Sequence, residues 1–326
     1  MEQNLVEKKE IKRDGRRMGL AALLYAVINL LVSAAWLVGE FLVKAIPQIA
    51  NVTDPAEGER IVITVLESLM ESGTCMIVGV MAGVLFLLLF FRKQGVHKQL
   101  FKSERKMTPG RFAAMACVFF GGQLVFSLGY ELMEAGLNLV GFSAESAMEM
   151  ATGSSKTLSM LLYAGIIGPI AEELVYRGFL MRHLEKHGKT LAIVVTSILF
   201  GVMHGNLPQA LFATCVGLVL GYVAMEYSIL WSILLHILNN MVLADLLPMA
   251  LNGFSEQTQG IVNLVINGVF LVIGVVVLIV KRKELISWIR TNAWEKPRMK
   301  WILVNVTTIL FIAVHLAMAL LTLTAI

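Results

Sequence analysis

Long apolar stretches recur along the 326-residue chain and alternate with short polar or charged connections. A helix that crosses the hydrocarbon core of a bilayer needs about 17–25 mostly apolar residues. The stretches that approach this length are 18–38, 74–91, 112–128, 158–180, 191–204, 207–225, 230–247, 261–280 and 301–324. They predict an all-α, polytopic transmembrane bundle of about nine helices. Several stretches are short or carry polar residues, so a count of eight with one re-entrant helix stays open.

Composition supports a membrane protein. Hydrophobic residues make up 57% of the chain and charged residues only 15%, whereas soluble domains carry about 25% charged residues. This balance excludes a soluble globular enzyme, a disordered chain and a nucleic-acid-binding protein. The first apolar stretch is longer than the core of about 7–15 residues in a signal peptide, and it predicts an uncleaved helix. Cys75, Cys117 and Cys215 all lie inside apolar stretches, and we expect them to be packing residues.

Lys and Arg are concentrated in four segments: the N-terminal arm and the connections around 92–111, 182–189 and 281–300. By the positive-inside rule, nine helices that start from a cytoplasmic N-terminus place all four segments inside the cell. The opposite connections carry mainly acidic residues: Asp54, Glu57, Glu59, Glu145, Glu149 and Glu256. We therefore expect a multi-pass protein of the plasma membrane whose C-terminus lies outside. The basic segments are interpreted as flanks that set this topology, and a lipid-headgroup site is the alternative.

Ionisable residues at bilayer depth are costly and usually functional. In this chain they are concentrated between Glu172 and Asn240. Glu173 and Arg177 are four positions apart and share a helix face, so they can form an ion pair. Glu172 is turned about 100° away from that face and is free to project elsewhere. The alternative is that both acids only hold helices together.

Two further polar groups follow. His204 ends the fifth apolar stretch, and His236 and Asn240 share a helix face because they are four positions apart. Asn239 points about 100° away and is a weaker candidate. At about 1.5 Å per residue, His204 lies roughly 22 Å and His236 roughly 15 Å from the inner interface, so both can meet Glu172 within the membrane. Structural hydrogen bonding of these side chains is the alternative.

The ordered set Glu-Glu-x-x-x-Arg, Phe-x-x-x-His and His-x-x-x-Asn resembles the CPBP family of intramembrane proteases, also called Abi, which includes the type II CAAX prenyl endopeptidases. The resemblance covers roughly residues 158–245, which we expect to form the catalytic core between an N-terminal part (1–157) and C-terminal helices (246–326). It implies hydrolysis by an activated water, with Glu172 as acid/base and His204 as the second water-activating residue. It also implies that Glu173 and Arg177 form a supporting ion pair and that His236 and Asn240 stabilise the oxyanion.

Chemistry argued from the residues agrees with this role. Amide hydrolysis needs a base for water, an acid for the departing amine and donors for the oxyanion. Glu172, His204 and His236 would also make a three-ligand zinc set with an open position for water. However, the chain lacks a compact His-Glu-x-x-His helix. We therefore expect no tightly bound zinc, and a divalent metal such as zinc remains the open alternative.

The sequence thus predicts an intramembrane endopeptidase that acts on a membrane-associated, prenylated or precursor peptide. Its expected partners are membrane lipids and the peptide substrate, with no nucleic acid. The alternative is a catalytically silent immunity or scaffold protein of the same fold. A small-solute transporter is a third hypothesis, but the chain shows no internal repeat of the kind common in transporters.

Overall fold

The computed structural model describes residues 2–153 and 155–326, and nearly all of them are helical. The α-helices are α1 (Glu2–Ile49), α2 (Pro55–Met70), α3 (Thr74–Phe90), α4 (Pro109–Leu139), α5 (Glu145–Thr152), α6 (Leu158–Leu162), α7 (Gly168–Glu173), α8 (Met181–Leu184), α9 (Lys189–Val202), α10 (Leu207–Glu226), α11 (Ile229–Ile237), α12 (Leu247–Leu251), α13 (Glu256–Thr291), α14 (Lys296–Leu303) and α15 (Val306–Leu321). Three short 3-10 helices are η1 (Arg92–Gln94), η2 (Val96–Gln99) and η5 (Glu185–His187), and three π-helices are η3 (Tyr163–Ile167), η4 (Leu174–Leu180) and η6 (Leu238–Leu246). The strands β1 (Phe142–Ser143) and β2 (Thr324–Ala325) pair antiparallel.

The polytopic all-α class is confirmed. In the described part of the chain, six helical stretches are long and apolar enough to span a bilayer, and the number rises to eight if the bent pairs α2–α3 and α14–α15 each count as one span. The expected count of nine is therefore approximate. The fifth predicted helix, 191–204, corresponds to α9, which has only 14 residues. It is mostly buried within the bundle, and the turn that follows it is covered by α5, where Asn206 Nδ2 donates to Ala147 O at 2.6 Å.

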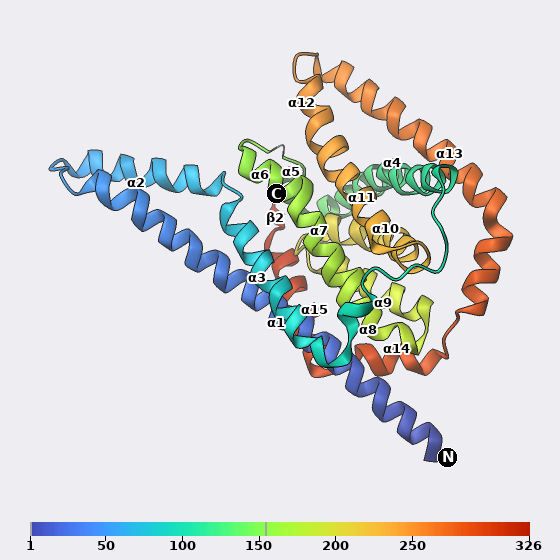
Figure 1. The fold of residues 1–326 in the computed structure, drawn as a ribbon. Helices are drawn as coiled ribbons and strands as arrows, with labels where there is room; N and C mark the ends of the chain where they lie inside the picture. Colours follow the sequence, from blue (N-terminus) through green and yellow to red (C-terminus); the bar gives the residue numbers. More distant parts are fainter. Residues whose placement is uncertain (1, 154) are drawn as a thin grey trace.

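The core surrounds one nearly continuous helix made of α7, η4 and α8. Tyr176, Phe179 and Met181 on this helix are fully or almost fully buried, against side chains of α1, α3 and α9. Figure 1 shows it near the middle of the molecule, whereas α13 lies at the edge and the α1–α2 hairpin projects away from the body. The two candidate glutamates are the last residues of α7, within this central helix, so the fold places them in the interior.

Glycines let the helices approach closely. A Cβ on Gly79 or Gly83 would collide with side chains of α1, and a Cβ on Gly221 would lie 2.9 Å from Ile193 on α9. Such spacing of small residues permits tight helix packing. The pairs that begin at Gly79 and Gly217 thus serve contacts within the chain.

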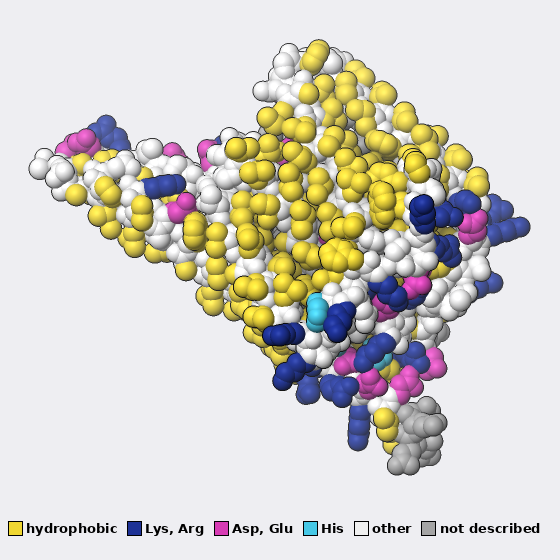
Figure 2. Space-filling view, viewed as in Figure 1, with side chains coloured by type: hydrophobic (Ala, Val, Ile, Leu, Met, Phe, Trp, Pro, Cys, Tyr) yellow, Lys and Arg dark blue, Asp and Glu magenta, His cyan; other side chains and the backbone are white. Residues whose placement is uncertain are grey.

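All four basic segments meet at one end of the bundle. Ion pairs join them: Lys186 to Glu10 at 2.7 Å, Lys102 to Glu185 at 3.0 Å and Arg298 to Glu7 at 2.6 Å. Charged side chains gather at this end in Figure 2, near the start of α1. The strand β2 near the C-terminus pairs instead with β1, which follows the far end of α4. The start of α1 and the strand β2 therefore lie at opposite ends of the bundle.

Candidate active site

The predicted ion pair is present and completely buried. Arg177 Nη1 lies 2.9 Å from Glu173 Oε1, and neither side chain is exposed. Arg177 Nη2 also donates to Gly217 O at 3.3 Å, and the guanidinium lies 4.0 Å from the centre of the Phe200 ring. A Cβ on Gly217 would lie 3.1 Å from Arg177 Nη2, so the glycine makes room for this arrangement. The pair is a fixed internal element with no access to solvent.

His236 joins both glutamates. Its Nδ1 lies 3.1 Å from Glu173 Oε1, and its Nε2 lies 3.7 Å from Glu172 Oε2. Because an ionised carboxylate only accepts hydrogen bonds, Glu173 favours the proton on Nδ1. The second distance exceeds hydrogen-bond length. Glu173 therefore orients the imidazole so that Nε2 faces Glu172.

His204 follows the end of α9. Its Nδ1 lies 2.8 Å from Phe200 O, which places the proton on Nδ1 and leaves Nε2 as the acceptor. The Phe200 ring meets the rings of His204 and His236 nearly at right angles, with centroids 5.1 and 5.8 Å apart. Gly205 takes φ +57°, and the Asn206 side chain then accepts from Gln209 N and caps α10. This tight turn fixes His204 beside the site.

Asn239 and Asn240 both line the site, so the expectation that Asn239 would point elsewhere is wrong. Asn240 Nδ2 donates to Ala164 O at 3.1 Å, and Asn239 Nδ2 donates to Asn240 Oδ1 at 3.0 Å. Gln123 Nε2 on α4 donates to Asn239 Oδ1 at 2.5 Å. The prediction assumed 3.6 residues per turn, but this segment is the π-helix η6. Wider turns of this kind are frequent at functional sites, and η3 and η4 flank Glu172 and Glu173 in the same way.

These groups face one cavity of about 550 Å³. Glu172, His204, His236, Asn239 and Asn240 line it, and Glu172 retains 20% side-chain exposure. Glu173 and Arg177 are absent from the lining and lie behind His236. The other polar lining residues were not predicted from the sequence; they are Gln123, Ser155, Tyr163, Gln209, Asp245, Asn263 and Asn267. Asp245, an acid within an apolar stretch, is the strongest signal among them in the sequence.

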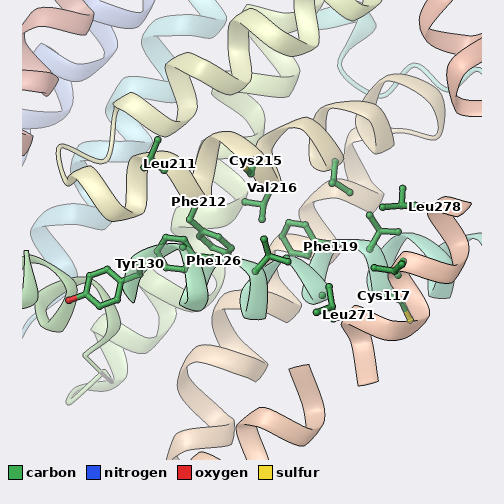
Figure 3. Close-up of a pocket in the computed structure, with 18 of the residues that line it drawn as sticks. Cys117, Phe119, Phe126, Tyr130, Leu211, Phe212, Cys215, Val216, Leu271 and Leu278 are labelled. Atoms are coloured by element: carbon green, nitrogen blue, oxygen red, sulfur yellow. The ribbon is translucent and has the colours of Figure 1, made fainter. Parts of the chain in front are cut away.

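An apolar groove of about 410 Å³ adjoins the cavity, between α4, α10 and α13. Figure 3 shows Phe119 and Phe126 on α4 facing Phe212 and Val216 on α10. These four residues also line the polar cavity, so the two spaces share a wall. All three cysteines are free, and Cys117 and Cys215 line this groove. A polar cavity thus lies beside an apolar groove.

The residues of the zinc alternative are Glu172, His204 and His236. Among the described residues, no three His, Cys, Asp or Glu side chains are placed to hold one metal ion. The Nδ1 atoms of the two histidines are bonded within the protein, to Glu173 and to the carbonyl of Phe200, and each ring keeps its Nε2.

This geometry defines a class: a polytopic helical membrane protein with a buried carboxylate–imidazole site. Comparison with known proteins then identifies the relationship. Residues 154–242 match the family model "Type II CAAX prenyl endopeptidase Rce1-like", so the resemblance indicated by the motifs is confirmed for that segment. Every predicted site residue lies within it.

A curated relative points the same way. The chain is 27% identical over 114 residues to "Putative membrane peptidase YdiL" of Bacillus subtilis (strain 168). The match covers 34% of this chain and 47% of the relative, so the chain spans about half the length of the protein it matches. No solved structure matches the chain. At the family level, these similarities are to membrane peptidases.

Proposed function

We propose that the chain is an intramembrane endopeptidase that hydrolyses a peptide bond of a membrane-associated, prenylated or precursor peptide. The observation that supports this most is the convergence of Glu172, His204 and His236 on one cavity, with the Glu173–Arg177 pair behind His236. Three polar groups that are remote in sequence would not be brought together at bilayer depth without a functional gain.

Glu172 acts as the general base. Its carboxylate takes a proton from a water in the cavity, and the resulting hydroxide attacks the substrate carbonyl carbon. His204 presents Nε2 as an acceptor and orients the same water. The proton held by Glu172 then passes to the departing nitrogen as the C–N bond breaks. The products are one carboxylate and one amine, and one water is consumed.

Donors for the developing oxyanion come from α11 and η6. The amide of Asn240 uses one N–H for Ala164 O and keeps a second for the substrate oxygen. His236 donates through Nε2 when protonated, and Glu173 stabilises that charge from behind. Such donors typically contribute about 10²–10³ in rate.

The apolar groove explains why the substrate is associated with a membrane. A lipid-like chain or an apolar side chain of the peptide would lie between α4, α10 and α13, with its scissile bond in the polar cavity. Apolar burial contributes about 25 cal/mol per Å² and would hold the peptide near the site. We therefore place the protein among membrane lipids, in the plasma membrane.

The test compares peptides that accumulate in membranes of cells carrying wild-type protein or the Glu172→Gln variant. Glutamine keeps the shape but cannot accept a proton, so cleavage is expected to fall by about 10²–10⁴. Lys283→Gln, on the exposed part of α13, is the matched control and retains full cleavage. Retained cleavage in a folded Glu172→Gln variant contradicts the proposal. An unchanged cellular phenotype in that variant supports the silent immunity or scaffold alternative.

A further inference from the structure

The cavity contains a second acidic side chain that the proposed hydrolysis does not use. Asp245 on η6 is only 4% exposed and lines the same space as Glu172. Its Oδ1 accepts a hydrogen bond from Ser155 N at 3.0 Å. Among the described residues, no Lys, Arg or His nitrogen lies within 4.0 Å of it, and nearby Lys156 pairs with Glu71 instead.

Asp245 differs in this respect from every other buried acid in the described chain. The others are Asp14, Glu173 and Glu226. Each has a basic partner: Lys186 at 2.8 Å, Arg177 at 2.9 Å and Arg105 at 3.1 Å, respectively. An ionised carboxylate that leaves water without a counter-charge costs several kcal/mol. A cation delivered by a ligand would recover that cost.

The position of Asp245 fits a peptide that extends from the reaction centre. It follows His236 of α11 by nine residues, at a distance of about 11–14 Å if each residue rises by about 1.2–1.5 Å. An extended peptide advances about 3.3 Å per residue, so this separation corresponds to three or four residues. Asn239 and Asn240, which lie between the two residues along the chain, and Asn267 on α13 line the same cavity, and their amides can bond the peptide backbone.

We propose that Asp245 binds a Lys or Arg side chain of the substrate, about three or four residues from the bond that is cleaved. The proposal rests on the endopeptidase function and adds a specificity-determining residue to it. The cation lies toward the end of the cavity formed by Gly153, Ser155 and Pro248, which is the end remote from the basic segments.

The test uses the full chain in proteoliposomes and a synthetic peptide library randomised over Leu, Ala, Ser, Lys and Glu. Cleavage products are sequenced by mass spectrometry. Wild-type protein is expected to enrich Lys about tenfold at one fixed position, equivalent to about 1.4 kcal/mol. Asp245→Asn keeps the acceptor for Ser155 N but removes the charge, so the enrichment of Lys among the products of the variant is expected to disappear. Asp245→Lys shifts the preference to Glu at the same position.

A binding measurement separates this proposal from the proposed function. The Glu172→Gln protein is titrated with two peptides that differ at one position, which is Lys in one peptide and norleucine in the other. This is the enriched position or, if no cleavage is found, the fourth residue from the centre of the peptide. The Lys peptide is expected to bind about tenfold more tightly, and the added Asp245→Asn change abolishes the difference. Lys-selective binding without cleavage in the wild type contradicts only the hydrolytic function. Cleavage without Lys preference overturns the role of Asp245. A third outcome also overturns the proposal: Asp245→Ala loses thermal stability, while Asp245→Asn equals the wild type in every assay. That outcome shows a purely structural role for Asp245.

Discussion

At the scale of single residues, Glu173 is the centre of the site although it does not line the cavity. One carboxylate oxygen of Glu173, Oε1, is the hydrogen-bond partner of both Arg177 and His236. The i,i+4 spacing predicts the contact to Arg177, because neighbouring helix positions share a face. The contact to His236 could not be predicted, since it depends on how two helices remote in sequence are packed.

This sharing predicts separate effects on stability and activity. Arg177→Met leaves the buried carboxylate without its strongest partner, and the free energy of unfolding is expected to fall by about 3–5 kcal/mol. The double variant Glu173→Met/Arg177→Met removes both charges and is expected to recover most of that loss. It does not recover cleavage, because His236 has lost the acceptor that orients it. Unfolding in detergent and peptide turnover measure the two effects, and recovery of both together would contradict the positioning role.

The two asparagines allow a graded prediction. Asn240→Ala removes the proposed oxyanion donor and is expected to lower kcat by about 10²–10³ with little change in KM. Asn239→Ala removes only the hydrogen bond that Asn239 donates to Asn240. We therefore expect kcat to fall by about tenfold, which corresponds to the cost of one neutral hydrogen bond. Steady-state kinetics on one reconstituted substrate gives both values. A larger loss for Asn239→Ala would assign the donor role to Asn239 instead.

At the scale of elements, hydrophobic runs located the helices but not their ends. The helix α1 extends from Glu2 to Ile49, well beyond the predicted 18–38, because its charged first turns remain helical. The helix α2 was not predicted, since Glu57, Glu59 and Arg60 interrupt its apolar pattern. The π-helices were also missed, because a wider turn depends on local packing that the spacing of residues does not show.

The contact between α9 and α10 yields a prediction at this scale. A Cβ on Gly201 would overlap Thr214 Oγ1 and the backbone oxygen of Ala210. Gly201→Ala therefore forces the helices apart, with an expected cost of about 1–3 kcal/mol and reduced cleavage because α9 leads directly to His204. Gly260→Ala on α13 is the control, since nothing lies within 4 Å of that position. It is expected to be neutral or slightly stabilising because alanine favours helix. Equal melting temperatures for the two variants would show that the α9–α10 contact can adjust without cost.

At the scale of the whole molecule, the charged end and the reaction cavity are set apart. The basic segments meet where α1, α8 and α14 lie together. The cavity instead includes Gly153 and Ser155, from the connection that precedes α6 at the other end. If the positive-inside rule holds, the peptide reaches the site from the outer side of the membrane. The sequence supplied the charges for this argument, whereas only the fold shows which connection borders the cavity.

This arrangement can be tested by labelling cysteines from one side of the membrane. The three native cysteines are changed to Ala, and Lys93→Cys in η1 or Gly253→Cys in the turn before α13 is introduced at an exposed position. In intact cells, a membrane-impermeant maleimide is expected to label Gly253→Cys, and Lys93→Cys only after permeabilisation. The result does not depend on whether α9 crosses the membrane fully. The start of α9 and the end of α10 lie together, since Lys189 pairs with Glu226, so this helix pair does not change the side on which the chain continues. The number of crossings between the two labelled positions therefore stays odd. Labelling of both positions from the same side would break that parity and contradict the fold. The reverse pattern would keep the fold but place the entrance of the cavity on the cytoplasmic side, so that the peptide would have to come from within the cell.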